Sequence, residues 1–404
     1  MKKQLFILIT LVMIVSVVLA GCAPAAAPEE AAPAAAEPAA EEPAAEEAVE
    51  EPAAEEPAAE AEEPAETMAE TKVCFVHNSF VDDQGWSFAH NRGTQYLDEN
   101  LEGVTTAYVD GVFDTGGTDS AKVFHDLVAQ DCNIVFGTSF GYNEAIQEAA
   151  IAAKDTNIVF HNYDQYLLED NLGSHRVHAE ETLYLLGIIA GLTTETGKVG
   201  MVGTFPIPQL VGQVNGFALG VKAVNPDAVV QVVWLNSWYD PPKEKEAAET
   251  LANAGADVIL GTASSPTVVQ TCEEIGVFSL GFENDLREYG PETNLTNKVF
   301  EWGIIYADIT QSVMDGSWES GENWYGIADG VSVVGPYGPG VPDETKQAVE
   351  DAQAQIISGE LDVFAGPLVD QNGEEHVAEG DTLSLEALLG IDWFVEGVET
   401  TAFE

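Results

Sequence analysis

Short runs of β-branched residues alternate with helical stretches from Lys72 onward, and this alternation restricts the fold more than any other feature. Strands that alternate with helices are typical of a parallel sheet with helices on both faces. The pattern predicts strands at Lys72–His77, Thr105–Val109, Asn133–Phe136, Ile158–His161, Lys198–Val202, Val229–Trp234, Val258–Gly261 and Val277–Gly281. We therefore expect an α/β fold.

Helices are expected between these strands, at Ala89–Glu99, Ala121–Gln130, Asn143–Ala153, Glu180–Leu192, Val211–Val224, Lys243–Ala254 and Thr267–Glu274. A polar stretch, Glu169–Ala179, interrupts the rhythm, and we interpret it as a loop. Because the alternation then restarts, two lobes fit the pattern better than one open sheet.

We place lobe 1 at residues 71–178 and lobe 2 at residues 179–291. The following segment, at about 292–328, is expected to return to lobe 1. The segment at about 329–404 is expected to close lobe 2, with a last helix near Asp343–Ser358. Such crossings would form a hinge between the lobes.

The charge balance excludes one large class of function. The chain has 69 acidic and 14 basic residues, a formal net charge of −55. Binding of nucleic acid requires clustered Lys and Arg, so we expect no nucleic-acid partner. A surface of this charge also disfavours anionic lipid headgroups, so association with a membrane requires a dedicated anchor.

The amino terminus supplies such an anchor. Lys2 and Lys3 precede an apolar run from Leu5 to Ala20, which is the layout of a secretory signal peptide, predicted at residues 1–21. The run ends in Leu-Ala-Gly-Cys at Cys22, which resembles the bacterial lipobox. This resemblance implies cleavage before Cys22, lipid attached to that residue, and a location on the outer face of the cell membrane.

Residues 22–70 begin with the lipidated Cys22 and continue almost entirely as Ala, Glu and Pro. Recurrent Pro residues interrupt helix formation, and the Glu side chains repel one another. We interpret this segment as a disordered spacer. The other cysteines, Cys74, Cys132 and Cys272, lack the spacing of a zinc site and are either buried thiols or include one disulfide.

Ligands of open α/β sheets bind beyond the carboxyl ends of the strands. The loops at these ends combine aromatic rings with single carboxylates and amides, which suits a flat polar ligand. They are Asn78–Trp86, Thr138–Tyr142, Asn162–Asp164, Phe205–Pro208, Asn236–Pro241, Ala263–Pro266 and Glu283–Asp285. We expect the binding site among these loops.

No catalytic residue, metal site or cofactor is predicted. Gly137–Gly141 fits the GxSxG nucleophile motif by letter, but the only His beyond residue 178 is His376, in the irregular tail. We interpret the motif as a small-residue ligand loop. His77 and His161 end strands, and we expect them to be hydrogen-bonded histidines in or beside the core.

Six segments together resemble the basic membrane protein family of ABC-transporter substrate-binding lipoproteins, which includes purine nucleoside receptors. They are Val81–Trp86, Gly137–Tyr142, Gly203–Pro208, Asn215–Pro226, Ser237–Pro241 and Ile356–Val363. The resemblance implies a type I periplasmic-binding-protein fold, with two Rossmann-like lobes, a hinge and a central ligand cleft. It also implies a monomer that delivers a purine nucleoside or nucleobase to ABC permease subunits.

Carried over by position, the resemblance implies particular ligand contacts. Trp86 and Trp238 would form the stacking pair, and Phe140 would line the pocket. The polar contacts would be Asp164, Asp240 and Asp285.

Two departures from the family pattern concern Ser87, which follows Trp86 where many relatives have Asn, and Trp302, near the later crossover. We include both among the ligand contacts. If Trp302 fills the space of a sugar, the ligand would be a free nucleobase.

Alternative functions remain open at this point. The same features suit a binding protein for a sugar or another polar solute. An exported nucleoside hydrolase would need clustered carboxylates, which only Asp82 and Asp83 approach. A surface receptor that signals through a partner protein would share every one of these features.

Overall fold

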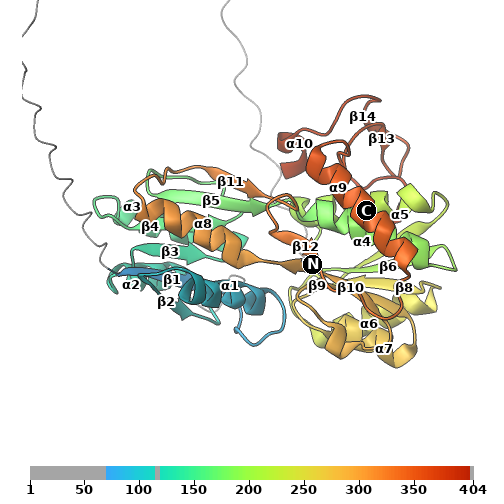
Figure 1. Cartoon of the computed structure of the whole chain (residues 1–404), viewed down its shortest axis with the longest axis horizontal. Helices are drawn as coiled ribbons and strands as arrows, with labels where there is room; N and C mark the ends of the chain where they lie inside the picture. The colour runs from blue at the N-terminus through green and yellow to red at the C-terminus, as the bar shows by residue number, and fades with distance from the viewer. Residues whose placement is uncertain (1–69, 114–118, 401–404) are drawn as a thin grey trace, which may run out of the picture. The chain divides into compact units, whose positions relative to one another are not determined.

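The computed structural model describes residues 70–113 and 119–400, which belong to the unit Glu66–Glu404. The signal peptide, Cys22 and nearly all of the spacer lie outside the described residues. Two large, mainly parallel sheets with helices on their faces make up most of this unit (Figure 1). Within the described ranges, no helix combines the length and apolarity needed to cross a bilayer.

The first sheet has six parallel strands in the order β11-β5-β4-β3-β1-β2. Its strands are β1 Thr71–Val76, β2 Val104–Val109, β3 Ile134–Gly137, β4 Val159–Tyr163, β5 Leu172–Val177 and β11 Glu322–Tyr325. Its helices are α1 Trp86–Asn100, α2 Ser120–Val128, α3 Asn143–Ala152 and α8 Trp302–Met314.

Side chains alternate across β1, so this strand contributes to a core on each face of the first sheet. Val73 and Phe75 pack in the cluster that includes residues of α1 and α8. Cys74 and Val76 pack in the cluster that includes residues of α2 and α3. A disulfide joins Cys74 to Cys132, whereas Cys272 is a buried free thiol.

The second sheet has seven strands in the order β12-β10-β9-β8-β6-β7-β15. They are β6 Lys198–Gly203, β7 Val229–Trp234, β8 Val258–Gly261, β9 Phe278–Glu283, β10 Asn294–Phe300, β12 Ser332–Val334 and β15 Val398–Glu399. Within this sheet, β12, at one edge, pairs antiparallel with β10. The helices are α4 Ala179–Thr193, α5 Pro208–Val224, α6 Pro241–Asn253, α7 Thr267–Ile275 and α9 Asp343–Ser358.

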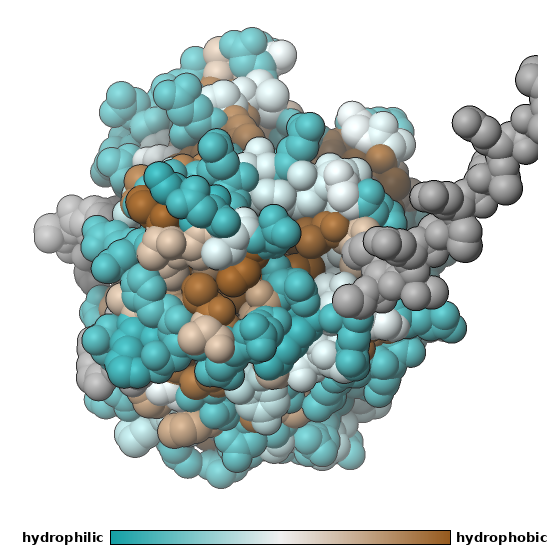
Figure 2. All heavy atoms as spheres, turned by 90° about the vertical axis from the view of Figure 1, so that its left-hand side faces the viewer, coloured by the Kyte–Doolittle hydropathy of each residue, from teal (hydrophilic) through white to brown (hydrophobic). Residues whose placement is uncertain are grey.

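A small C-terminal part covers the second lobe near α9 and α5 (Figure 1). It contains β13 Leu368–Val369, β14 Glu375–Val377 and α10 Leu385–Leu389. On the face shown in Figure 2, apolar residues form small groups separated by hydrophilic ones.

The eight expected strands and seven expected helices are all present, with ends that differ by a few residues, as is the helix at Asp343–Ser358. The expected loop at Glu169–Ala179 is wrong, because residues Leu172–Val177 form the buried strand β5. Its polar side chains have partners inside the lobe: the Ser174 hydroxyl accepts a 3.0 Å hydrogen bond from the backbone N–H of Gln165, and Arg176 pairs with Asp164.

The chain crosses between the sheets after β5, after β10 and between β11 and β12. The segment that was expected to return to lobe 1 from about residue 292 first adds β10 to the second sheet. The return therefore begins with α8 and ends with β11. These crossings make the hinge of a two-lobed fold.

Candidate functional site

A pocket lies between the two lobes at the carboxyl ends of their strands. Its lining from the first lobe is Asn78, Trp86, Ser139, Phe140 and Tyr163. Its lining from the second lobe is Thr204, Ile207, Gln209, Leu210, Gln213, Trp238, Thr262, Ser264, Phe282, Glu283 and Phe300. The pocket therefore lies where ligands of open α/β sheets bind, beyond the carboxyl ends of the strands.

Trp86 forms an aromatic wall on the first lobe. Its indole N–H donates a 2.7 Å hydrogen bond to the carbonyl oxygen of Thr138, which fixes the orientation of the ring. The ring also makes edge contacts with Tyr163 and Trp302, at centroid distances of 4.9 and 5.3 Å. The indole is held before any ligand arrives, so little conformational entropy is lost on binding.

Trp238 lies on the opposite lobe, in the loop after β7. Its ring packs against Phe205, with centroids 4.8 Å apart and planes inclined by 58°. Trp86 and Trp238 therefore line one pocket from two lobes, which is an arrangement that can enclose a planar molecule.

Three polar atoms of the pocket lining have no hydrogen-bond partner within the described ranges: Thr204 Oγ1, Gln213 Oε1 and Glu283 Oε2. Their residues are 1%, 2% and 3% exposed. A buried polar group without a partner costs about 1–3 kcal/mol, so such groups usually mark a place where a ligand or water completes the bonding.

Glu283 is the most unusual of these residues. It ends β9 with a φ of 72°, in the left-handed region that a Glu rarely adopts. Burial raises the pKa of its carboxyl group to about 8, the nearby Lys298 opposes this rise, and Asp83 adds to it. The Lys298 ammonium nitrogen is itself buried, 3.2 Å from the ring centroid of Phe300 and 3.7 Å from that of Phe282.

The structure brings three of the sequence-predicted ligand contacts into this pocket, namely Trp86, Phe140 and Trp238. The remaining five do not line it. Ser87 is buried beside it, where its hydroxyl donates a 3.2 Å hydrogen bond to Asn78 Oδ1. Trp302 is 1% exposed and stacks on His90 behind Trp86, at a centroid distance of 4.1 Å.

The three predicted carboxylates have local partners instead. Asp164 forms an ion pair with Arg176. Asp285 pairs with Arg287 at 2.7 Å. The Asp240 side chain accepts a hydrogen bond from the backbone N–H of Lys243 and caps α6, a common use of Asp directly before a helix.

Sequence reasoning missed the polar groups that do line the pocket. Glu283 stands in an expected strand-end loop, but Asp285 was preferred. Gln213 is on α5, where a helical pattern gives no sign that its side chain faces a cleft. Lys298 gave no clear signal either, because its neighbours in the mixed stretch Leu295–Phe300 include the polar residues Thr296 and Asn297.

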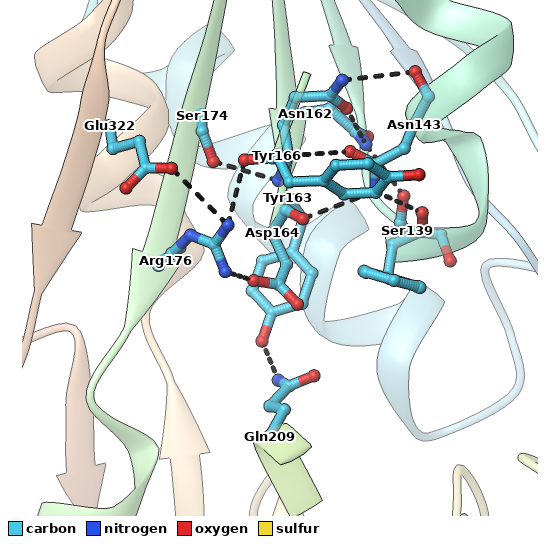
Figure 3. Close-up of polar contacts among 12 residues, drawn as sticks. Ser139, Asn143, Asn162, Tyr163, Asp164, Tyr166, Ser174, Arg176, Gln209 and Glu322 are labelled. Carbon is cyan, nitrogen blue, oxygen red and sulfur yellow. Dashed lines mark hydrogen bonds and ion pairs between the residues drawn. The ribbon is translucent and has the colours of Figure 1, made fainter. Parts of the chain in front are cut away.

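Figure 3 shows the polar contacts on the first-lobe side of a second, adjoining cavity. Arg176 joins Asp164 and lies 3.7 Å from Glu322. The side-chain amide of Gln209, on α5, donates a hydrogen bond to the hydroxyl of Tyr163, on β4. This bond crosses between the lobes at residues shared by both cavities.

The lobes also touch on another side of the pocket. The Asn284 side-chain amide donates to the carbonyl oxygens of Gln84 and Gly85, at 3.1 and 2.9 Å. A Cβ atom at Gly85 would collide with the backbone of Ser264, so this approach requires glycine. The described conformation is therefore one in which the lobes are closed on each other.

None of the described histidines is part of the pocket lining. His90 contacts the hydroxyl of Tyr306, and His161 Nδ1 lies 3.1 Å from His175 Nδ1. The expectation of a hydrogen-bonded His77 is wrong, because neither ring nitrogen has a partner in the described part of the chain. Its aromatic neighbours, including Phe75 and Tyr108, offer it no polar atom in hydrogen-bond contact.

Comparison with known proteins identifies the family. The Bmp family model, described as ABC transporter substrate-binding protein PnrA-like, matches residues 70–365. A purine-binding protein of Brucella abortus is 33% identical over 83% of this chain and 95% of its own length. A Haloferax volcanii protein, named as a candidate ABC transporter glucose-binding protein, is 34% identical over 81% of this chain and 80% of its own.

The fold has a close counterpart among solved structures. A solute-binding protein of an ABC transporter system from Conexibacter woesei superposes with a TM-score of 0.62 at 21% identity. The match covers 72% of this chain and 98% of the other. The expected type I periplasmic-binding-protein fold is confirmed, and the chain belongs to the Bmp family of ABC transporter substrate-binding proteins.

Proposed function

We propose that this chain is the solute-binding lipoprotein of an ABC importer and that it binds a purine nucleobase or nucleoside between its lobes. One observation carries the proposal: Trp86 and Trp238 line the same pocket from opposite lobes, together with the buried, unpartnered oxygen atoms of Thr204, Gln213 and Glu283. Rings can hold the faces of a planar heterocycle while the polar atoms bind its edge.

The residue roles follow from this arrangement. Trp86 and Trp238 are the proposed stacking pair, and Phe140, which is 47% exposed, is a rim contact. Glu283 and Gln213 are the proposed contacts to the edge of the ligand.

Ser87 and Trp302 act indirectly in this proposal. Ser87 orients Asn78 through its hydroxyl, and Trp302 supports Trp86 from behind. Asp164, Asp240 and Asp285 would act only through the loops that they stabilise, since each already has a partner.

The proposed cellular arrangement extends the sequence analysis. Lipid on Cys22 would hold the protein on the outer face of the membrane after removal of residues 1–21, and residues 22–70 would form the tether. The two-lobed unit would act as a monomer and present its closed form to the permease. Closure of the lobes around a ligand is a common device for such recognition.

A sugar is the second candidate ligand. The Haloferax volcanii relative, with its glucose-binding name, favours it, and tryptophan rings also pack on pyranose faces. The purine-binding name of the Brucella abortus relative supports the first candidate. A competition experiment separates the two.

We propose binding without turnover. Asp83 is one of the two carboxylates that an exported nucleoside hydrolase could use. Its side chain accepts hydrogen bonds from the backbone N–H groups of Gly85 and Ser87, at 2.8 and 3.2 Å. It organises the start of α1 and does not line the pocket. Incubation with inosine or adenosine should therefore release no free base.

Calorimetric titration of the full chain in mild detergent tests the proposed ligand. The panel contains adenine, guanine, hypoxanthine, their nucleosides and glucose. The proposal predicts one-to-one binding of at least one purine together with a change in tryptophan fluorescence. Binding of glucose without binding of any purine would replace the purine proposal by the sugar alternative.

A further inference from the structure

The carboxyl group of Glu283 faces the pocket in an environment that does not complete its bonding. The residue is 3% exposed, and its Oε2 atom has no partner among residues 70–113 and 119–400. Its backbone is held in the left-handed region, which is strained for a residue that carries a side chain. The strained backbone and the unbonded carboxyl oxygen together indicate that Glu283 contacts the ligand in the bound state.

Lys298 is the natural counter-ion, but it does not bind the carboxyl group. The two residues lie on neighbouring strands, with Lys298 opposite Phe282 and Val299 opposite Glu283. The Lys298 ammonium nitrogen lies against the rings of Phe282 and Phe300 and has no hydrogen-bond partner in the described ranges. Both rings line the pocket, so they hold the lysine behind its wall.

The charged and titratable groups around this pair come from several elements. Asp83, before α1, and Tyr163, on β4, interact electrostatically with Glu283. Glu180, on α4, interacts with Lys298. Burial raises the pKa of Glu283 to about 8, and burial lowers the pKa of Lys298 well below its usual range. Burial therefore favours the protonated form of the Glu283 carboxyl group at neutral pH.

The protonation state decides what the group can recognise. A carboxylate offers only acceptors, whereas a carboxylic acid offers one donor beside one acceptor. A carboxylate pairs with two adjacent N–H donors, as on the edge of guanine. A carboxylic acid pairs with an edge that presents an acceptor next to a donor.

We propose that Glu283 recognises the ligand as a carboxylic acid and selects a neutral heterocycle whose edge places a hydrogen-bond acceptor beside a donor. The amidine edge of adenine and the lactam edge of hypoxanthine both have this pattern. The inference rests on the proposed purine-binding function and makes Glu283 the residue that determines specificity at that site.

Adenine affinity as a function of pH tests the inference, measured by calorimetry on the full chain from about pH 6 to about pH 9.5. The dissociation constant should stay level below about pH 8 and then rise by up to about tenfold per pH unit. Titrations in two buffers of different ionisation enthalpy should show uptake of about one proton per adenine near pH 9 and almost none near pH 6.

Glu283→Gln separates the two forms of recognition, because an amide keeps one donor and one acceptor but cannot ionise. The variant should bind adenine within about threefold of the parent at pH 7 and should lose the pH dependence. Glu292→Gln is the matched control: this Glu is exposed, lies in the same lobe and is absent from the pocket lining. It should keep the parent profile.

The outcomes distinguish this inference from the function on which it rests. Purine binding that is independent of pH, or a loss of about 100-fold or more in a folded Glu283→Gln variant, would overturn the inference and leave the function standing. Absence of binding to any purine by the parent chain would overturn both.

Discussion

The side-chain amide of Asn284 donates a 2.9 Å hydrogen bond to the carbonyl oxygen of Gly85, and this bond joins the two lobes beside the pocket. A second bond from the same amide reaches the carbonyl of Gln84. Asn284→Ala should favour the open form and weaken ligand binding by about 1–2 kcal/mol, or roughly 5- to 30-fold. Calorimetry measures the affinity, and small-angle scattering measures the opening of the lobes.

Asn100→Ala is a suitable control for this change, because the exposed Asn100 side chain bonds to the Tyr96 carbonyl within the first lobe. The Asn100→Ala variant should keep the ligand affinity and the scattering profile of the parent chain. Unaltered affinity and scattering in Asn284→Ala would show that the interlobe bonds do not stabilise the closed form.

Trp238→Ala removes one of the two rings that line the pocket from opposite lobes. Loss of stacking should weaken purine binding by at least about 1 kcal/mol. The neighbouring Tyr239 is 54% exposed and does not line the pocket, so Tyr239→Ala should bind as the parent does. Equal affinities for the two variants would reject Trp238 as a stacking residue.

The Cys74–Cys132 disulfide spans 58 residues of the first lobe, so it restricts the unfolded chain over a long loop. Replacing both cysteines by Ala should lower the free energy of unfolding by about 4 kcal/mol on the loop-entropy model. Urea denaturation provides the measurement, and the double variant should no longer respond to a reducing agent. A difference below about 1 kcal/mol would mean that the bond adds little to stability.

His77 makes stability depend on pH. Burial lowers its pKa from 6.5 to about 3, so the unfolded chain binds more protons between these values. Stability should therefore be lost as the pH falls below about 6.5, with a contribution from His77 of about 1.4 kcal/mol per pH unit. His77→Phe should reduce the slope by that amount in urea denaturation between about pH 6 and pH 4. An unchanged slope would contradict a neutral, buried His77.

The sequence predicted the fold correctly wherever apolar residues recur in a clear strand or helix pattern. Each strand of the predicted βα units is present, because runs such as Val258–Gly261 are buried on both faces. The strand β5 was missed because Ser174, His175 and Arg176 are polar, and their burial depends on partners such as Asp164 and His161. Those partners are brought together only by the folded lobe.

The candidate site could be predicted only in part. The aromatic residues at strand ends indicated Trp86, Phe140 and Trp238, and these three residues line one pocket. Carboxylates gave no such signal, because an Asp that caps a helix or pairs with an Arg has the same letter as one that faces a ligand. Glu283 is distinguished from Asp285 by its burial and its free oxygen atom, and neither property is visible in the sequence.

A crystal structure of the full chain grown with adenine tests the central claim most directly. The account predicts one adenine between the rings of Trp86 and Trp238, with its amidine edge in hydrogen-bond contact with the carboxyl group of Glu283. Adenine bound away from these residues, or a cleft that holds no purine at saturating concentration, would contradict it.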